Sequence, residues 1–139
     1  MSYEEKGQWV YLVVTAVSSA IYLALLLDRA DPTPLAEVDY VPILLWTIGA
    51  AVAGSIVGRI AIEIAKPSDG YTSDVRDRDI GRLGEYVGGT ILGIGMVVPF
   101  ILAITEADHF WIANSMYLVF ALAALVGTTI KLIAYRRGF

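Results

Sequence analysis

Charged residues divide the chain into four long uncharged stretches of about 20 residues each. A helix rises about 1.5 Å per residue, so about 20 apolar residues cross the roughly 30 Å of hydrocarbon in a bilayer. The pattern therefore predicts one integral membrane domain over residues 1–139. We expect an all-α bundle of four transmembrane helices, arranged as two up-down hairpins. The predicted spans cover about residues 8–27, 41–64, 85–105 and 109–134.

The positions of the basic residues predict the orientation of these spans. Four spans place both termini and the connection 66–84 on one side of the membrane, and nine of the ten lysines and arginines fall on that side. Short loops rich in Lys and Arg remain cytoplasmic, so both termini are expected to be inside. The net charge of −4 then divides into −5 outside and +1 inside. We therefore expect a multi-pass protein of a bacterial cytoplasmic membrane, in contact with the lipid bilayer.

Composition narrows the chemistry that these spans can perform. Hydrophobic residues make up 57% of the chain and charged residues 17%, which leaves little for a soluble catalytic domain. There is no cysteine, so thiolate nucleophiles, disulfides and cysteine metal centres are excluded. We expect no catalytic residue, no cofactor, no metal ion and no nucleic-acid partner. Glu106, Asp108 and His109 in an outer loop have metal-ligand chemistry, but a solvated acidic loop is their ordinary interpretation.

Small residues repeat at intervals of four in the second and third spans. This spacing places them on one helix face, where they let a second helix backbone approach closely inside lipid. Pro99, which lacks a backbone donor, is expected to kink the third span unless a neighbouring group compensates. The candidate helix-packing residues, which also suggest a homo-oligomer, are Ala50, Gly54 and Gly58 in the second span and Gly84, Gly88, Gly89 and Gly93 in the third.

Arg59 and Glu63 lie one helical turn apart near the inner end of the second span. At i, i+4 spacing they share a face, which predicts an ion pair within this helix. Arg59 can extend toward the headgroups and Glu63 toward water, so a helix-end ion pair is one interpretation. The alternative is a pair that is coupled to the movement of a proton or another ion.

The cytoplasmic connection 66–84 combines a turn with a stretch in which acids and bases alternate. Ser73 or Asp74 is suited to cap a helix that continues into the third span, with an apolar face beginning at Ile80. We therefore predict an amphipathic inner extension of the third helix from about residue 73. Its charged face is either solvated, with weak salt bridges along the helix, or a docking surface for a partner protein. The candidate interaction residues are Asp74, Arg76, Asp77, Arg78, Asp79 and Arg82.

Three segments carry a resemblance to a known group, namely residues 74–84, 106–114 and 131–139. In these segments the chain resembles the uncharacterised small four-span membrane proteins of actinobacteria, and the resemblance extends over almost the whole sequence. The clearest shared feature is the pattern Asp-x-Arg-Asp-x-x-Ile before a span, which begins here at Asp74. That group is similar to products encoded beside small helix-turn-helix regulators, which implies a sensing or regulatory role. The resemblance implies no catalytic or binding residue.

These features favour a non-enzymatic regulatory, sensory or accessory membrane protein. It would act through helix packing and its charged cytoplasmic segment, as a homo-oligomer or with a cytoplasmic or membrane protein partner. The alternative is a small oligomeric channel, transporter or transporter subunit, which the glycine-rich third span and the Arg59–Glu63 pair suggest. The strong charge bias and the lack of an acid within the first span argue against a small multidrug resistance transporter.

Overall fold

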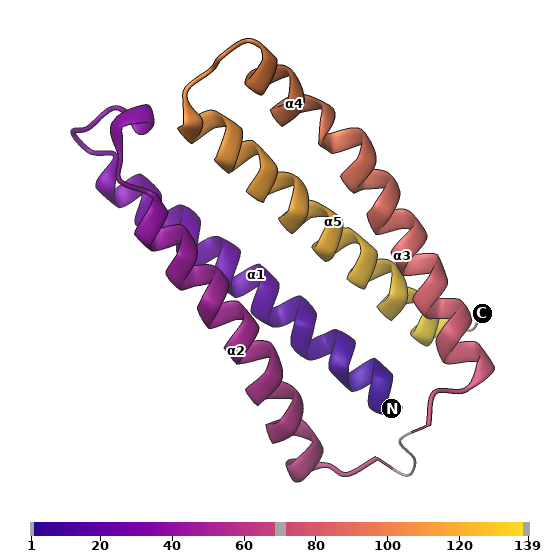
Figure 1. The fold of residues 1–139 in the computed structure, drawn as a ribbon. Helices are drawn as coiled ribbons and strands as arrows, with labels where there is room; N and C mark the ends of the chain where they lie inside the picture. Colours follow the sequence, from indigo (N-terminus) through magenta and orange to yellow (C-terminus); the bar gives the residue numbers. More distant parts are fainter. Residues whose placement is uncertain (1, 69–71, 138–139) are drawn as a thin grey trace.

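The computed structural model describes residues 2–68 and 72–137, so residues 69–71 of the connection 66–84 lie outside the described part. Every regular element in the described ranges is helical (Figure 1). In chain order these are α1 (Tyr3–Arg29), the short 3-10 helix η1 (Leu35–Glu37), α2 (Val41–Ala65), α3 (Val75–Gly95), α4 (Val97–Ile104) and α5 (His109–Arg137).

Four helical segments are long and apolar enough to cross a membrane: α1, α2, α3 together with α4, and α5. The prediction of an all-α fold with four such segments is confirmed. The helices extend beyond the predicted spans into charged sequence because their ends are capped. At the start of α1, for example, the Ser2 hydroxyl accepts a hydrogen bond from the Glu5 amide at 3.1 Å.

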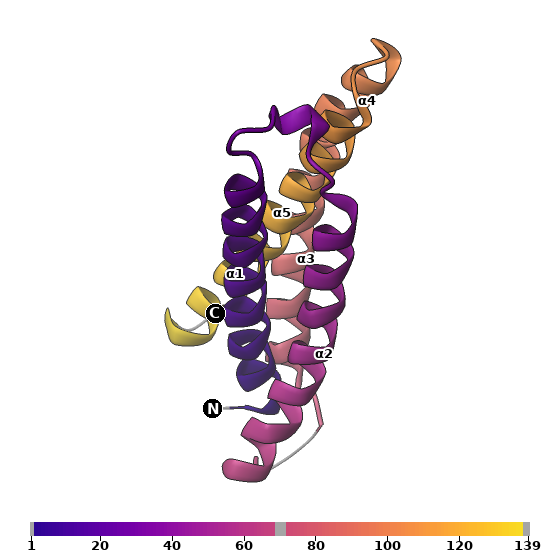
Figure 2. The same cartoon turned by 90° about the vertical axis from the view of Figure 1, so that its left-hand side faces the viewer.

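The helices lie side by side in the order α2, α1, α5 and α3, and α4 continues the line of α3 along α5 (Figure 1). α1 packs against both α2 and α5, whereas α2 and α3 are the outer helices and share no extensive contact within the described ranges. Viewed from the side, α5 crosses obliquely behind α1 and α2, so the row is twisted (Figure 2). The bundle is therefore open rather than closed around a central core.

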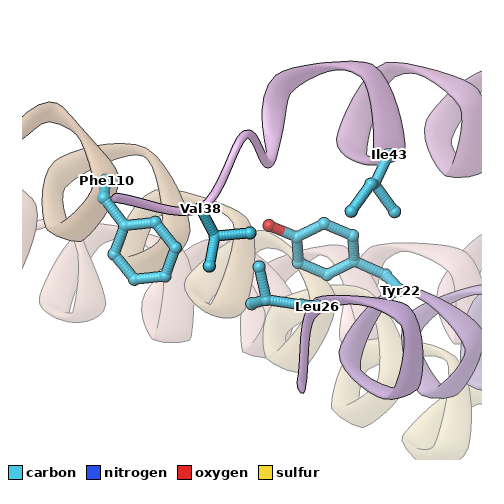
Figure 3. Close-up of a cluster of buried hydrophobic side chains, with 5 residues drawn as sticks. All are labelled: Tyr22, Leu26, Val38, Ile43 and Phe110. Carbon is cyan, nitrogen blue, oxygen red and sulfur yellow. The ribbon is translucent and has the colours of Figure 1, made fainter. Parts of the chain in front are cut away.

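The two ends of this row differ in character. Both termini and the α2–α3 connection lie at one end, which we call the termini end (Figure 1). The α1–α2 and α4–α5 connections lie at the opposite end, the loop end. At the loop end a buried apolar cluster joins α1, α2 and the segment between them to α5 (Figure 3). Its members are Tyr22, Leu26, Val38, Ile43 and Phe110.

The predicted amphipathic extension of the third span is confirmed as the first turns of α3. Asp74 is the N-cap, and its side chain accepts from the Asp77 amide at 2.7 Å while the Asp77 carboxylate accepts from the Asp74 amide at 3.3 Å. Ile80 is 0% exposed, which shows that the apolar face of this extension is packed against the rest of the protein. The extension is thus an integral part of the α3–α5 pair.

The third span is interrupted at Met96, three residues before Pro99. Pro99 has no backbone N–H, so the carbonyl group four residues earlier, at Gly95, loses its ordinary helical partner. The helix resumes at once, because the Phe100 amide donates to the Met96 carbonyl at 3.2 Å. The interruption at Met96 separates α3 from α4, and α4 continues the line of α3.

The backbones of α3 and α5 are in direct contact at three glycines. A Cβ atom at Gly84 would lie 2.8 Å from the carbonyl oxygen of Gly127, and one at Gly127 would lie 2.9 Å from that of Gly84. A Cβ at Gly88 would lie 3.2 Å from the Ala123 carbonyl oxygen. Two of the predicted packing residues therefore serve this crossing, while Gly127, their partner on α5, was not among the predictions.

The other predicted packing residues divide into two groups. Gly54 and Gly58 face α1, where added Cβ atoms would lie 3.5 Å and 2.8 Å from methyl groups of Val14 and Val10. Ala50 of α2 is exposed, and nothing lies within 4 Å of a Cβ built at Gly89 or Gly93 of α3. These three residues take no part in packing between the described helices.

Gly127→Ala is expected to lower the free energy of unfolding by about 1–3 kcal/mol, because the new methyl group forces the α3 and α5 backbones apart. Gly89→Ala is the matched control, since its methyl group meets no other atom and alanine is the better helix former. Thermal unfolding followed by circular dichroism in detergent measures both. Equal melting temperatures for the two variants would contradict the direct backbone contact.

Candidate functional site

Charged and polar side chains from four helices meet at the termini end, where the first turn of α1 lies between the last turns of α2 and the neighbouring ends of α3 and α5. The contacts fall into two sets, one between α1 and α2 and one that joins α1 to α3 and α5. We call the residues of these contacts the charge network. Its members are Ser2, Glu4, Lys6, Arg59, Glu63, Ser68, Asp77 and Tyr135.

Lys6 is the buried cation of the charge network, with a side chain only 3% exposed. Its ammonium group donates to Glu63 Oε2 at 3.4 Å, to Ser68 Oγ at 2.8 Å and to the Lys66 carbonyl oxygen. The second Glu63 oxygen accepts from the Ser68 amide at 2.6 Å. Because an ammonium group has three N–H donors, all of them are used, and the start of α1 is tied to the end of α2.

The sequence predicted an ion pair between Arg59 and Glu63, but the structure does not show this pair. Each residue instead has a partner on α1. Arg59 Nη2 lies 3.5 Å from Glu4 Oε1, and its Cζ lies 4.2 Å from the centre of the Tyr3 ring. A Cβ at Gly7 would lie 3.1 Å from the same Cζ, so this glycine makes room for the guanidinium group. The reason is that α1 begins before the apolar stretch, which places its charged first turn beside α2.

The second set of contacts centres on Asp77, whose carboxylate also caps α3. Asp77 Oδ1 accepts from the Tyr135 hydroxyl at 2.8 Å and from the Ser2 hydroxyl at 3.4 Å. Nearby, Arg76 Nη2 donates to the Tyr135 carbonyl oxygen at 3.0 Å. α3, α5 and the N-terminal turn of α1 are thus joined by side chains of the predicted interaction segment.

The remaining candidates of that segment behave differently. Arg78 and Arg82 are exposed, Asp79 is half-buried, and none of the three has a side-chain hydrogen bond or ion pair with any described residue. The predicted salt bridges along α3 do not form, because Asp74 and Asp77 are used in capping and Glu85 turns to Lys131 on α5, with a separation of 3.9 Å.

Arg78 and Arg82 line a cavity of about 370 Å³ between α1, α3 and α5, which we call the polar cavity. It lies at the edge of the charge network, and both acidic and basic side chains line it. Its lining residues are Glu4, Gln8, Ser73, Asp77, Arg78, Gly81, Arg82, Glu85, Lys131 and Tyr135. The sequence predicted three of these residues, and the rest come from helices whose neighbours it did not specify.

A second feature, which the sequence did not predict, is a groove of about 400 Å³ that lies over α1 between α2 and α5. Seven of its lining side chains carry hydroxyl groups, and we call it the hydroxyl groove. They are Tyr11, Thr15, Ser18, Ser19, Thr47, Ser55 and Tyr117. Several bond within the protein, as where the Tyr117 hydroxyl donates to Ser19 Oγ at 3.3 Å. In the sequence the only indication was the pair Ser18 and Ser19 about one turn after Thr15. The residues that lie opposite them could not be identified from the sequence.

In the described ranges no group of three or more His, Asp or Glu side chains is placed to hold a metal ion, and this includes the acids of the α4–α5 connection. Glu106 instead occupies the left-handed position after α4, with φ 55°. Its amide donates to the Ala103 carbonyl and the Ala107 amide to the Leu102 carbonyl, which closes the helix end.

Lys6→Met is expected to lower the melting temperature by several degrees, because it removes three hydrogen bonds of a buried ammonium group and leaves the half-buried Glu63 carboxylate without its cation. Lys66→Met is the matched control, since the Lys66 side chain is exposed and only its carbonyl group is used. Tryptophan fluorescence during heating in detergent measures both. Equal shifts in the two variants would show that Lys6 does not hold α1 to α2.

The termini end therefore offers arginine donors suited to anions, and the hydroxyl groove offers weak donors and acceptors within the apolar spans. No family model, curated protein or solved structure matches the chain.

Proposed function

We propose that this protein is a non-enzymatic regulatory or accessory membrane protein that works by associating with a second copy of itself through the uncovered face of α3. The charge distribution supports a cytoplasmic position for both termini and the charged segment, in a bacterial cytoplasmic membrane. The observation that carries the proposal is the open row of helices, in which α3 packs against α5 on one side and against no described helix on the other.

The composition of that uncovered face supports association. Gly89 and Gly93 lie one turn apart, and open space surrounds the position of each missing side chain. A glycine in a helix costs about 1 kcal/mol relative to alanine, and contacts within this chain do not offset that cost at either position. In lipid, helices associate through close van der Waals packing at small residues, which these glycines permit.

The same helix connects this face to the charged segment. α3 runs without interruption from Val75 to Gly95, so the segment with Arg78 and Arg82 and the face with Gly89 and Gly93 belong to one rigid rod. Association through the glycine face would therefore bring two charged segments to a fixed separation at the termini end. The charged cytoplasmic surface of such a protein would therefore differ between the single chain and the dimer, which suits a regulatory role.

Replacing Gly89 and Gly93 together by leucine is expected to weaken self-association by at least about tenfold, because the two side chains prevent close approach. The folded chain should tolerate both, since nothing lies within 4 Å of either new Cβ. Stepwise photobleaching of labelled chains diluted in lipid vesicles measures the fraction of dimers.

The control for this measurement is the pair Gly49→Leu and Ala53→Leu, which places two leucines one turn apart on exposed positions of α2. These changes should leave the dimer fraction unchanged. Monomers at every lipid dilution of the unaltered chain, or loss of dimers only in the α2 variant, would overturn association through α3.

The hydroxyl groove favours a second candidate function, a subunit of a small channel or transporter. Hydroxyl groups from three helices lie together in the apolar part of the protein, and a second chain over the groove would enclose a polar path. The Arg59–Glu63 pair no longer supports this function, because both residues are held by α1.

If this second function holds, vesicles containing the protein should pass protons or K⁺ under an imposed gradient. Thr15→Val with Ser55→Ala should then lower the flux at least about threefold by removing polar groups from the path. Thr129→Val is the control, because its hydroxyl lies outside the groove and donates to the Leu125 carbonyl. Vesicles without any flux from the unaltered protein would exclude this function.

A further inference from the structure

Two arginines in the polar cavity have guanidinium groups that no described residue engages. Arg78 and Arg82 stand at i, i+4 on α3, so their side chains leave the same face of the helix about 6 Å apart. Both are exposed, and both line the cavity. A pair of guanidinium groups at this spacing can flank one tetrahedral oxyanion, each with two parallel N–H donors.

The carboxylates of the cavity do not compete for these arginines, because each has another partner. Glu4 pairs with Arg59, which lies just outside the cavity, and Glu85 pairs with Lys131. Asp77 accepts from two hydroxyl groups and from a backbone amide. The lining carries three acids and three bases, and after these contacts are set aside Arg78 and Arg82 are the charged groups of the cavity that no described residue engages.

The cavity has open space beside Gly81. Gly81 lies between the two arginines in the sequence and lines the cavity, and nothing lies within 4 Å of a Cβ built on it. Gln8 and Ser73 also line the cavity, and their side chains add N–H and O–H donors. The cavity thus has space for a group the size of a phosphate, with donors around it.

The level of the cavity along the helices is that of lipid headgroups. Arg82 lies one turn before the uncharged stretch of α3 that begins at Tyr86, and Lys131 directly follows the uncharged stretch of α5. The boundary between charged and uncharged sequence is where hydrocarbon meets the phosphate groups of the bilayer. Phosphate esters are therefore the anions that the cavity meets at the highest concentration.

From these observations we infer that the polar cavity is a binding site for a phosphate ester, held by the guanidinium groups of Arg78 and Arg82. The ester is either the headgroup of an anionic lipid or a water-soluble organic phosphate, and both present the same oxyanion to the arginines. The site is distinct from the glycine face of α3, so it does not depend on self-association.

The experiment uses the full chain in a phosphate-free maltoside detergent and follows the ³¹P resonance of the ligand during titration with protein. Dioctanoyl phosphatidylglycerol represents the lipid headgroup, and glycerol 3-phosphate represents the soluble ester. Binding of either broadens and shifts its resonance. A response to the lipid alone assigns the site to the headgroup, and a response to glycerol 3-phosphate shows that a soluble ester is sufficient; each result supports the site.

Two variants test the residues by different means. Arg78→Gln with Arg82→Gln removes the donors, and Gly81→Leu fills the cavity without changing any charge. Each is expected to raise the apparent dissociation constant at least about tenfold. Neither change removes a contact within the described protein, so both variants should keep the melting temperature of the unaltered chain.

The matched control is Lys66→Gln with Arg137→Gln, which removes two exposed charges from the same end but outside the cavity. It should change the dissociation constant less than about twofold, since only general attraction is lost. The inference is overturned if neither phosphate ester binds the unaltered chain. It is also overturned if the two double variants weaken binding equally, or if Gly81→Leu binds normally.

Discussion

The contact between the backbones of α3 and α5 is the constraint on which most other features depend. Gly84, Gly88 and Gly127 let the two helices approach until each backbone lies where a side chain would otherwise be. Lipid supplies no hydrophobic force between helices, so this close packing is what holds the third span to the fourth. It also sets the rotation of α3, which turns Ile80 inward and leaves Arg78 and Arg82 toward the start of α1.

The rotation of α3 determines which of its residues face α5 and which do not. On α3, Gly84, Gly88 and Gly95 face α5, whereas nothing lies within 4 Å of a Cβ built at Gly81, Gly89 or Gly93. α3 therefore provides the contact with α5, part of the lining of the polar cavity, and a face that no described helix covers. The proposed association and the proposed phosphate site use different parts of it, and each is independent of the other.

The sequence was sufficient to predict the spans, because the length of an uncharged stretch is directly related to the thickness of a bilayer. It also predicted the capped start of α3, since helix capping follows from local backbone chemistry. It could not predict the partners of Arg59 and Glu63, because helical spacing gives the face of a residue but not the helix that lies opposite. For the same reason Gly127 and the hydroxyl groove emerged only from the arrangement of the helices.

The burial of Lys6 has a consequence for the order in which the chain is built into a membrane. Its three acceptors all belong to residues 63–68, which leave the ribosome only after the second span has been synthesised. The contacts of Lys6 that join the start of α1 to the end of α2 can therefore form only once residues 63–68 have been synthesised. Until that point this link between the two helices does not exist, however early α1 itself is complete.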